Sequence, residues 1–158
     1  NCWQNILSVY PNARFIIAGM NPTREVTALA HRQGVEVTGF VDEILPYYQT
    51  ADIFVAPFRL ARGVQNKVLQ AFSCALPVVS TPMGAEGINC VADDSILIAS
   101  TPSEFIAQVT RLATEPELSE RIGAKALQLI KQEYSWEGQL SPILDFLLAH
   151  KNVNEKGT

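Results

Sequence analysis

Cysteine and histidine are scarce in this sequence of 158 residues, which limits the chemistry that its side chains can perform. The three cysteines, Cys2, Cys74 and Cys90, are far apart and lack the short spacings of metal-binding motifs. An odd number of widely separated cysteines is typical of a reducing compartment, so we expect a cytoplasmic protein without a metal site. The two histidines, His31 and His150, fall on predicted helices away from the predicted ligand site, and we assign neither a catalytic role.

Basic runs and long apolar runs are also missing. The chain has 12 Lys and Arg residues against 16 Asp and Glu residues, a formal net charge of −4. This balance argues against a nucleic-acid-binding surface. No apolar stretch approaches the roughly 20 residues that a membrane helix needs. The opening Asn1-Cys2-Trp3 contains neither an initiator methionine nor a signal peptide, so we expect the sequence to start inside a longer protein.

Short apolar runs alternate with amphipathic stretches along the chain. Continuous apolar runs, such as residues 14–19, are typical of strands covered on both faces. Strands are predicted at 14–19, 35–41, 52–58, 77–81 and 95–99. Helices are predicted at 3–9, 23–33, 43–51, 64–74, 102–113, 116–133 and 136–150. The helix at 64–74 is expected to bury Val64, Val68, Leu69, Ala71, Phe72 and Ala75. Thr101-Pro102-Ser103-Glu104 is a strong helix start, with Thr as N-cap and Glu three residues later.

This order predicts an α/β fold, a doubly wound Rossmann-like parallel sheet of five to six strands with helices on both faces and a helical C-terminal part. We expect one domain over residues 1–150, a polar tail at 151–158, and a further strand ahead of Asn1. In such sheets, ligands bind beyond the C-terminal ends of the strands.

The segment 62–81 joins a glycine turn, an amphipathic helix and a buried strand. Gly63 precedes the helix, and without a Cβ it lets the backbone N–H groups of Val64 and Gln65 approach an anion. The helix N-terminus adds a partial positive charge of roughly half an elementary charge. The segment therefore predicts a phosphate-binding turn and a nucleotide-linked ligand. A plain helix start is the alternative.

Six motifs, in order, resemble the C-terminal half of GT-B-fold glycosyltransferases of group 1, the glycogen-synthase-like group. They are Phe15–Gly19, Val37–Asp42, Tyr47–Ile53, Asn66–Phe72 followed by Pro77–Thr81, Gly84–Ile88 and Tyr134–Glu137. The resemblance implies that this half binds a UDP- or GDP-linked nucleotide sugar as substrate, with no cofactor and no obligatory metal. It implies a separate N-terminal half that binds the acceptor, and transfer of the sugar with retention to a glycan or lipid-linked acceptor in polysaccharide biosynthesis. The present part alone is then expected to be inactive. Lipid-linked acceptors leave open peripheral association of the full-length protein with the inner face of a membrane.

By the same resemblance, specific residues surround the donor. Phe40 and Val41 flank the base, although ordinary core packing is the alternative for both, and above all for Phe40. Lys67 reaches the diphosphate or is simply solvated. Glu86 contacts donor hydroxyls, and we place it with Arg62 among the catalytic candidates. A flexible turn that happens to contain an acid is the alternative for Glu86.

The chain departs from the family at two positions. The family usually carries two glutamates eight positions apart, one near the donor sugar and one on the ribose hydroxyls; here the aligned residues are Arg62 and Gln70. Gln70 offers one acceptor and one donor group, so it would hold a ribose more weakly than a carboxylate does. A satisfied surface amide is the alternative for Gln70. Arg62 can pair bidentately with a diphosphate or be solvated. Two alternatives stay open: a catalytically silent relative that binds a nucleotide or a protein, and a nucleotide-sugar epimerase of the same fold.

Overall fold

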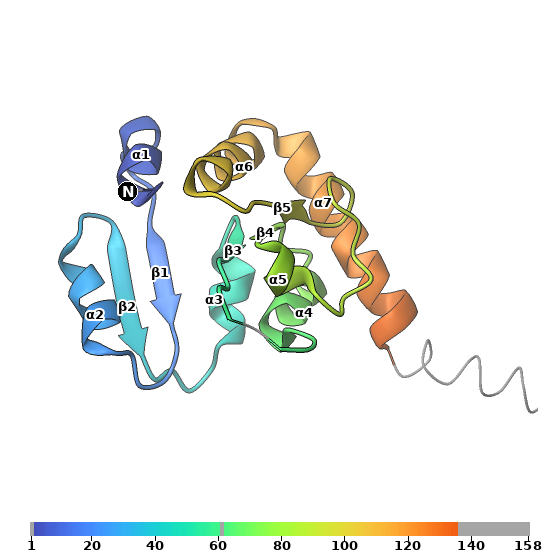
Figure 1. Cartoon of the computed structure of the whole chain (residues 1–158), viewed down its shortest axis with the longest axis horizontal. Helices are drawn as coiled ribbons and strands as arrows, with labels where there is room; N and C mark the ends of the chain where they lie inside the picture. The colour runs from blue at the N-terminus through green and yellow to red at the C-terminus, as the bar shows by residue number, and fades with distance from the viewer. Residues whose placement is uncertain (1, 61, 136–158) are drawn as a thin grey trace, which may run out of the picture.

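The structure is a computed structural model that describes residues 2–60 and 62–135, in which strands and helices follow one another in the predicted order, apart from one short helix at Pro82–Ala85 that was not predicted (Figure 1). The strands are β1 (Phe15–Ala18), β2 (Val35–Gly39), β3 (Phe54–Ala56), β4 (Val78–Ser80) and β5 (Leu97–Ile98). The helices are α1 (Cys2–Val9), α2 (Arg24–Thr27), α3 (Leu45–Thr50), α4 (Asn66–Ser73), α5 (Pro82–Ala85), α6 (Pro102–Thr114) and α7 (Pro116–Leu129). A 3-10 turn, η1 (Ala28–His31), follows α2, and a π-helical turn, η2 (Ile130–Tyr134), follows α7. The helix predicted at 136–150 and the tail at 151–158 lie outside the described residues.

All the strand pairs are parallel, which confirms the predicted α/β class. The five strands lie in two sheets, β1-β2 and β3-β4-β5, instead of one continuous sheet. Strands β1 and β3 are neighbours in Figure 1, but within the described residues each pairs with a strand on one edge only. Helices α1 and α6 contact each other at the top of the view, where the Cys2 thiol lies 3.5 Å from the Pro102 carbonyl oxygen.

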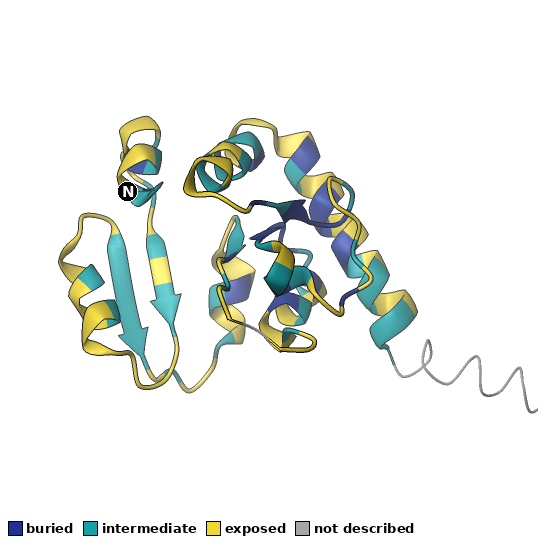
Figure 2. Cartoon of the chain, in the orientation of Figure 1, coloured by how far each residue is buried: buried dark blue, intermediate teal, exposed yellow. Residues whose placement is uncertain are grey.

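The core surrounds β3-β4-β5 (Figure 2). Val78, Val79 and Ser80 of β4 are fully buried, as expected for a strand covered on both faces. In β1, by contrast, Ile16 is 36% exposed and the other residues are only half-buried. The prediction of cover on both faces is therefore wrong for β1, because within the described residues no helix packs extensively on this strand, whose main contact is with β2.

Helix α4 packs against the larger sheet through most of its predicted apolar face. Val68, Ala71 and Phe72 are buried at the i, i+3, i+4 spacing of one helix face, and Leu69 packs against the same cluster. The prediction fails at Val64, which is 43% exposed. Val64 lies in the loop before the helix, so helical periodicity does not decide where its side chain lies.

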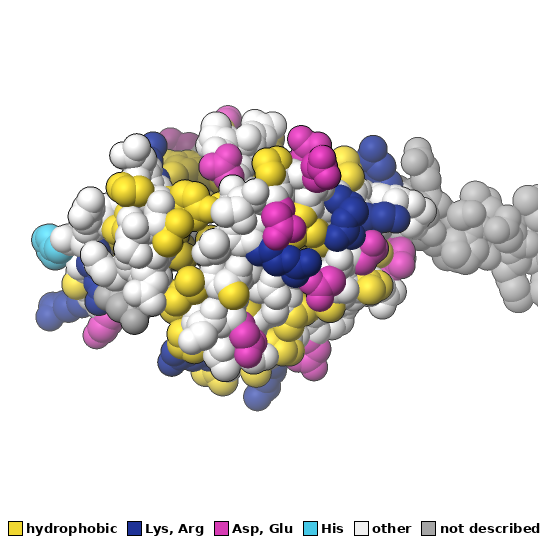
Figure 3. Space-filling view, turned by 90° about the horizontal axis from the view of Figure 1, so that it is seen from above, with side chains coloured by type: hydrophobic (Ala, Val, Ile, Leu, Met, Phe, Trp, Pro, Cys, Tyr) yellow, Lys and Arg dark blue, Asp and Glu magenta, His cyan; other side chains and the backbone are white. Residues whose placement is uncertain are grey.

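The outer surface carries charges of both signs side by side (Figure 3). Arg111 of α6 lies 2.8 Å from the Asp93 carboxylate, and Arg121 of α7 lies 3.7 Å from that of Asp94. These pairs are exposed, so each contributes little to stability, about 0–1 kcal/mol. These pairs place charges of both signs side by side on the exposed surfaces of α6 and α7.

Thr101 caps α6 in the manner that the sequence predicts. The Glu104 N–H donates to Thr101 Oγ1 at 3.2 Å, and the Glu104 carboxylate accepts from the Ser100 N–H at 2.6 Å. The bond from Ser100 is the largest cause that lowers the pKa of Glu104, with the Thr101 bonds adding to it. Because the folded-state pKa is lowered, this contribution to stability is present at neutral pH and is lost as the pH falls through that pKa.

We expect Thr101→Ala to lower the free energy of unfolding by about 1 kcal/mol, because the N–H group of Glu104 loses its side-chain acceptor. Urea denaturation at neutral pH measures the change. Ser103→Ala is the control, since it removes an exposed hydroxyl two residues later. Equal losses in the two variants would contradict the capping role.

Candidate functional site

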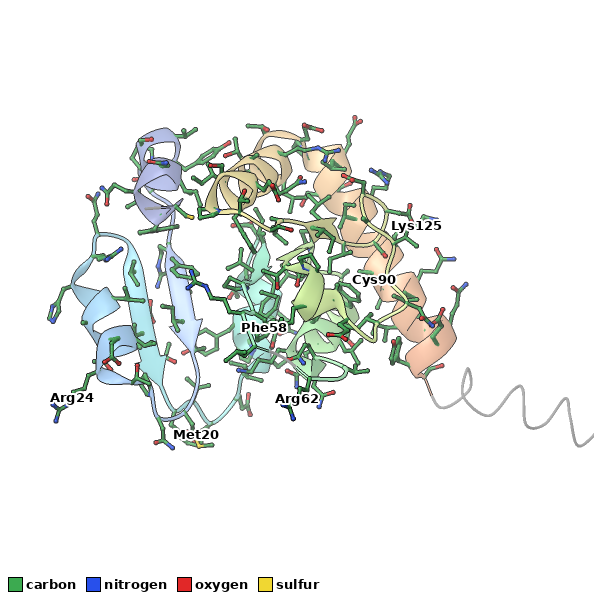
Figure 4. The ribbon with its side chains drawn as sticks, in the orientation of Figure 1. Met20, Arg24, Phe58, Arg62, Cys90 and Lys125 are labelled. Atoms are coloured by element: carbon green, nitrogen blue, oxygen red, sulfur yellow. The ribbon has the colours of Figure 1, made fainter. Side chains whose placement is uncertain are left out.

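Two loops leave the carboxyl ends of β3 and β4 at the same edge of the larger sheet. The first leads from β3 into α4, and the second contains α5. The strands are parallel and paired, so their carboxyl ends lie side by side. Figure 4 shows Phe58 and Arg62, both from the first loop, with Arg62 at the lower end of this part of the molecule. This edge is where the sequence predicts a ligand.

Thr81 joins the two loops. Its hydroxyl donates to the Phe58 carbonyl at 2.8 Å and accepts from the Gly84 N–H at 3.2 Å, which caps α5. Its own N–H donates to the Ala56 carbonyl at 3.2 Å. This role of Thr81 was not predicted from the sequence, although Thr81-Pro82 repeats the N-cap and first-turn proline of Thr101-Pro102. The residue fixes the distance between the two loops.

Glycines let these loops touch. Gly63 and Gly87 have φ angles of +65° and +77°, in the region that favours glycine. A Cβ added to Gly87 would lie 3.2 Å from Val64 Cγ2 and 3.5 Å from Val64 N, and one added to Gly84 would lie 2.8 Å from Phe58 Cδ2. The second loop therefore packs directly on the first. At Gly63 an added Cβ would meet nothing within 4 Å, so this turn is open on the outside.

The N-terminus of α4 opens onto this junction without a side-chain cap. Gln65 occupies the N-cap position, but its side chain makes no capping bond. Its amide nitrogen donates backward instead, to the Gly63 carbonyl at 2.9 Å and the Arg62 carbonyl at 3.5 Å. These bonds hold the turn in shape and leave the first turn of an eight-residue helix uncapped by Gln65. Such an end attracts anions.

The structure brings most of the predicted site residues to this junction. They are Arg62, Gly63, Val64 and Gln65 in the first loop, Lys67 in the first turn of α4, and Glu86 after α5. Gln70 lies one turn further along α4 and contacts Tyr48 of α3. All of these predicted site residues except Gln65 are exposed, so their polar groups are accessible to a ligand.

Phe40 and Val41 lie elsewhere, directly after β2 in the smaller sheet. Phe40 is 66% exposed, so the alternative that it belongs to the core is wrong. Val41 is half-buried. Both follow the carboxyl end of a parallel strand, as the prediction of a base-flanking role requires, but that role stays a prediction.

Tyr48 is a second residue that the sequence analysis did not connect with the site. It is buried on α3, and its hydroxyl lies 3.2 Å from Gln70 Oε1 and 3.4 Å from the Lys67 carbonyl oxygen. Desolvation is the main cause that raises the pKa of Tyr48, with a smaller contribution from Cys74. The phenol therefore stays protonated at neutral pH and acts as a hydrogen-bond donor.

A hollow of about 520 Å³ lies beside α5, lined mainly by apolar residues and by Glu86. Cys90 also lines it, and burial raises the pKa of this thiol, so it stays protonated. Within residues 2–60 and 62–135, no three His, Cys, Asp or Glu side chains are grouped to hold a metal ion. In the same part of the chain, no helix is long and apolar enough to cross a bilayer.

Solved structures share this fold. The C-terminal domain of a group 1 glycosyl transferase from Francisella tularensis superposes with a TM-score of 0.71 at 18% identity, over 85% of this chain and 78% of that domain. HepE of Anabaena, solved with UDP and glucose, superposes with a TM-score of 0.73 at 14% identity, over 92% of this chain and 43% of HepE. At such low identity these likenesses show the fold alone.

Sequence comparison shows the family. "Glycosyltransferase 1 domain-containing protein 1" of Xenopus tropicalis is 33% identical over 78 residues, which make up 49% of this chain and 23% of the frog protein. The chain thus spans less than a quarter of that relative's length. The sequence model of the family "Glycosyl transferases group 1" matches residues 1–115. That match extends from the first residue through the strands, both loops of the site and the whole of α6, and it identifies the chain as a member of the group 1 glycosyltransferases.

Proposed function

We propose that this chain is the part of a retaining glycosyltransferase that binds the nucleotide-sugar donor, a UDP- or GDP-linked sugar. The observation that carries the proposal is the contact of the Gly63 and Gly87 loops beside the uncapped N-terminus of α4. Backbone N–H groups and a helix dipole at one place suit a diphosphate. A fold neighbour that holds UDP and glucose supports the same assignment.

The exposed side chains give the site its expected chemistry. The N–H groups of Gly63, Val64 and Gln65 would bind the diphosphate. Arg62 would add a bidentate contact to it and so stabilise the departing nucleoside diphosphate. Gln70 would contact the ribose, and Glu86 the hydroxyls of the donor sugar. None of these steps needs a metal ion.

The proposal extends to a longer protein. Since the chain spans 23% of the frog relative, we assign acceptor binding to a separate N-terminal domain of the same protein. Transfer to a glycan or lipid-linked acceptor would then take place between the two domains. We place the protein in the cytoplasm, with peripheral contact at the inner face of the membrane, and expect residues 1–158 alone to be inactive.

Calorimetric titration with UDP, GDP and ADP, followed by turnover assays of the full-length protein with UDP- and GDP-sugars, tests the proposal. We expect one diphosphate to bind preferentially and its sugar derivative to be turned over. Binding without turnover would favour the alternative, a catalytically silent relative. The specific argument for that alternative is that Arg62 and Gln70 stand where the family usually carries two glutamates. Absence of binding to all three nucleotides would overturn the donor-site assignment.

Gln70→Glu should tighten nucleotide binding by about threefold to tenfold, because a carboxylate makes stronger, charge-assisted bonds to ribose hydroxyls than an amide does. Titration with the preferred nucleoside diphosphate measures the change. Gln128→Glu, which adds the same charge to an exposed position of α7, is the control. Unchanged or weaker binding in the Gln70 variant would argue against the ribose contact.

A further inference from the structure

Tyr48 is held rigidly beneath the middle of α4. Its side chain is 8% exposed and belongs to the same core cluster as Val68, Ala71 and Phe72. Its ring also lies 5.5 Å, centroid to centroid, from that of Phe54 on β3. Because the buried ring packs on both α4 and β3, it cannot move when an exposed side chain rotates, so the Tyr48 hydroxyl keeps a fixed position.

The hydroxyl has one hydrogen and two acceptors within reach. Gln70 Oε1 lies at 3.2 Å and the Lys67 carbonyl at 3.4 Å, both on α4. A contact to Oε1 restricts a side chain that is otherwise exposed and free to rotate. With Oε1 as the acceptor of the Tyr48 hydroxyl, the Nε2 group with its two hydrogens is the end of the amide left for a ligand.

We propose that Tyr48 is a positioning residue for the ribose contact, holding Gln70 so that its amide nitrogen donates a hydrogen bond to a ribose hydroxyl oxygen. The inference rests on the proposed function, since it specifies how that site recognises its nucleotide. A carboxylate accepts hydrogen bonds from a ribose, whereas this amide donates one. A tyrosine hydroxyl stays protonated throughout the neutral range, so it keeps donating to Oε1 there.

The fixed orientation has a measurable consequence. A Gln70 amide held in place binds without first losing rotational freedom, which a free glutamine side chain would lose on contact with the ribose. Tyr48→Phe removes the hydroxyl and keeps the ring, so the packing against Phe54 survives. We expect this variant to bind the ribonucleotide about threefold to tenfold more weakly, the effect of one hydrogen bond.

The test compares UDP or GDP, whichever the full-length protein binds, with its 2′-deoxy and 3′-deoxy forms. Calorimetry gives the ratio of affinities between the ribonucleotide and each deoxynucleotide. The variants are Tyr48→Phe, Gln70→Ala and the double variant. Tyr47→Phe is the matched control, because it removes a tyrosine hydroxyl from the neighbouring residue. Gln70→Ala changes only an exposed side chain, so the comparison does not depend on the folding of the Tyr48 variant alone.

The expected result is a lower ribose-to-deoxyribose ratio in both single variants, no further loss in the double variant, and no change in Tyr47→Phe. A merely structural role of Tyr48 would weaken all the nucleotides alike and leave the ratio unchanged. An unchanged ratio in Tyr48→Phe beside a lowered one in Gln70→Ala overturns the positioning role and leaves the donor site intact. Failure of the unmodified protein to bind any of these nucleotides overturns both the donor site and this inference.

Discussion

Gly63→Val is expected to weaken binding of the preferred nucleoside diphosphate by at least about tenfold, the equivalent of one charge-assisted hydrogen bond. Gly63 has a φ of +65°, which a β-branched residue adopts only with strain, so the turn and its N–H groups would shift. The new side chain would also occupy the open outer side of the turn, where nothing lies within 4 Å of an added Cβ. The fold itself should survive, because the substitution meets no neighbour. Titration beside a thermal melt measures both effects.

Gly63→Asn separates the two causes. Asparagine tolerates the left-handed region, so it keeps the backbone of the turn but still adds a side chain beside the N–H groups. We expect the affinity of the Gly63→Asn variant for the nucleoside diphosphate to lie between that of the Gly63→Val variant and that of the unmodified protein. Equal affinity of all three proteins would rule out a phosphate at this turn.

Gly123→Ala should destabilise the protein by about 2 kcal/mol, although alanine in a helix interior normally stabilises by about 1 kcal/mol relative to glycine. Gly123 is buried in α7, and a Cβ there would collide with the carbonyl oxygen of Ala75. That carbonyl belongs to the turn that ends α4. Ala75 has a φ of +54°, its N–H donates to the Phe72 carbonyl at 3.0 Å, and the Leu76 N–H donates to that of Ala71 at 3.0 Å.

Because two hydrogen bonds fix this turn, the helix α7 would have to move away from the core to admit the methyl group. Urea denaturation measures the loss in free energy of unfolding. Gly19→Ala, the same substitution where an added Cβ meets nothing within 4 Å, serves as the control and should change stability little. A Gly123 variant as stable as the unmodified protein would show that α7 and the Ala75 turn are not in close contact.

Local sequence signals predicted the elements of this fold because each depends on neighbouring residues. The Thr101 cap and the apolar spacing of Val68, Ala71 and Phe72 are of this kind. The half-exposed β1 was not predictable, since a continuous apolar run shows that a strand can be covered on both faces and not that helices actually pack there. The prediction for Val64 failed because the predicted helix began at residue 64, two residues before the actual start of α4 at Asn66.

The candidate site was predictable in part. Gly63 before a helix was visible as a turn, and the structure gives it the positive φ that makes glycine useful there. The packing of Gly87 on Val64 and the bond from Tyr48 to Gln70 join residues more than 20 positions apart, so no local pattern contains them. Which of the exposed side chains touch a ligand depends on that ligand, and for Arg62 and Glu86 the roles stay predictions.

The missing pairing between β1 and β3 has a consequence for how this chain unfolds. In Figure 1 the edges of these two strands that no described strand occupies face each other, so the two sheets meet without the hydrogen bonds that join the strands within each sheet. Local unfolding begins where the fewest backbone hydrogen bonds must break. We therefore expect the β1-β2 sheet to separate from β3-β4-β5 before either sheet loses its own strand pairs.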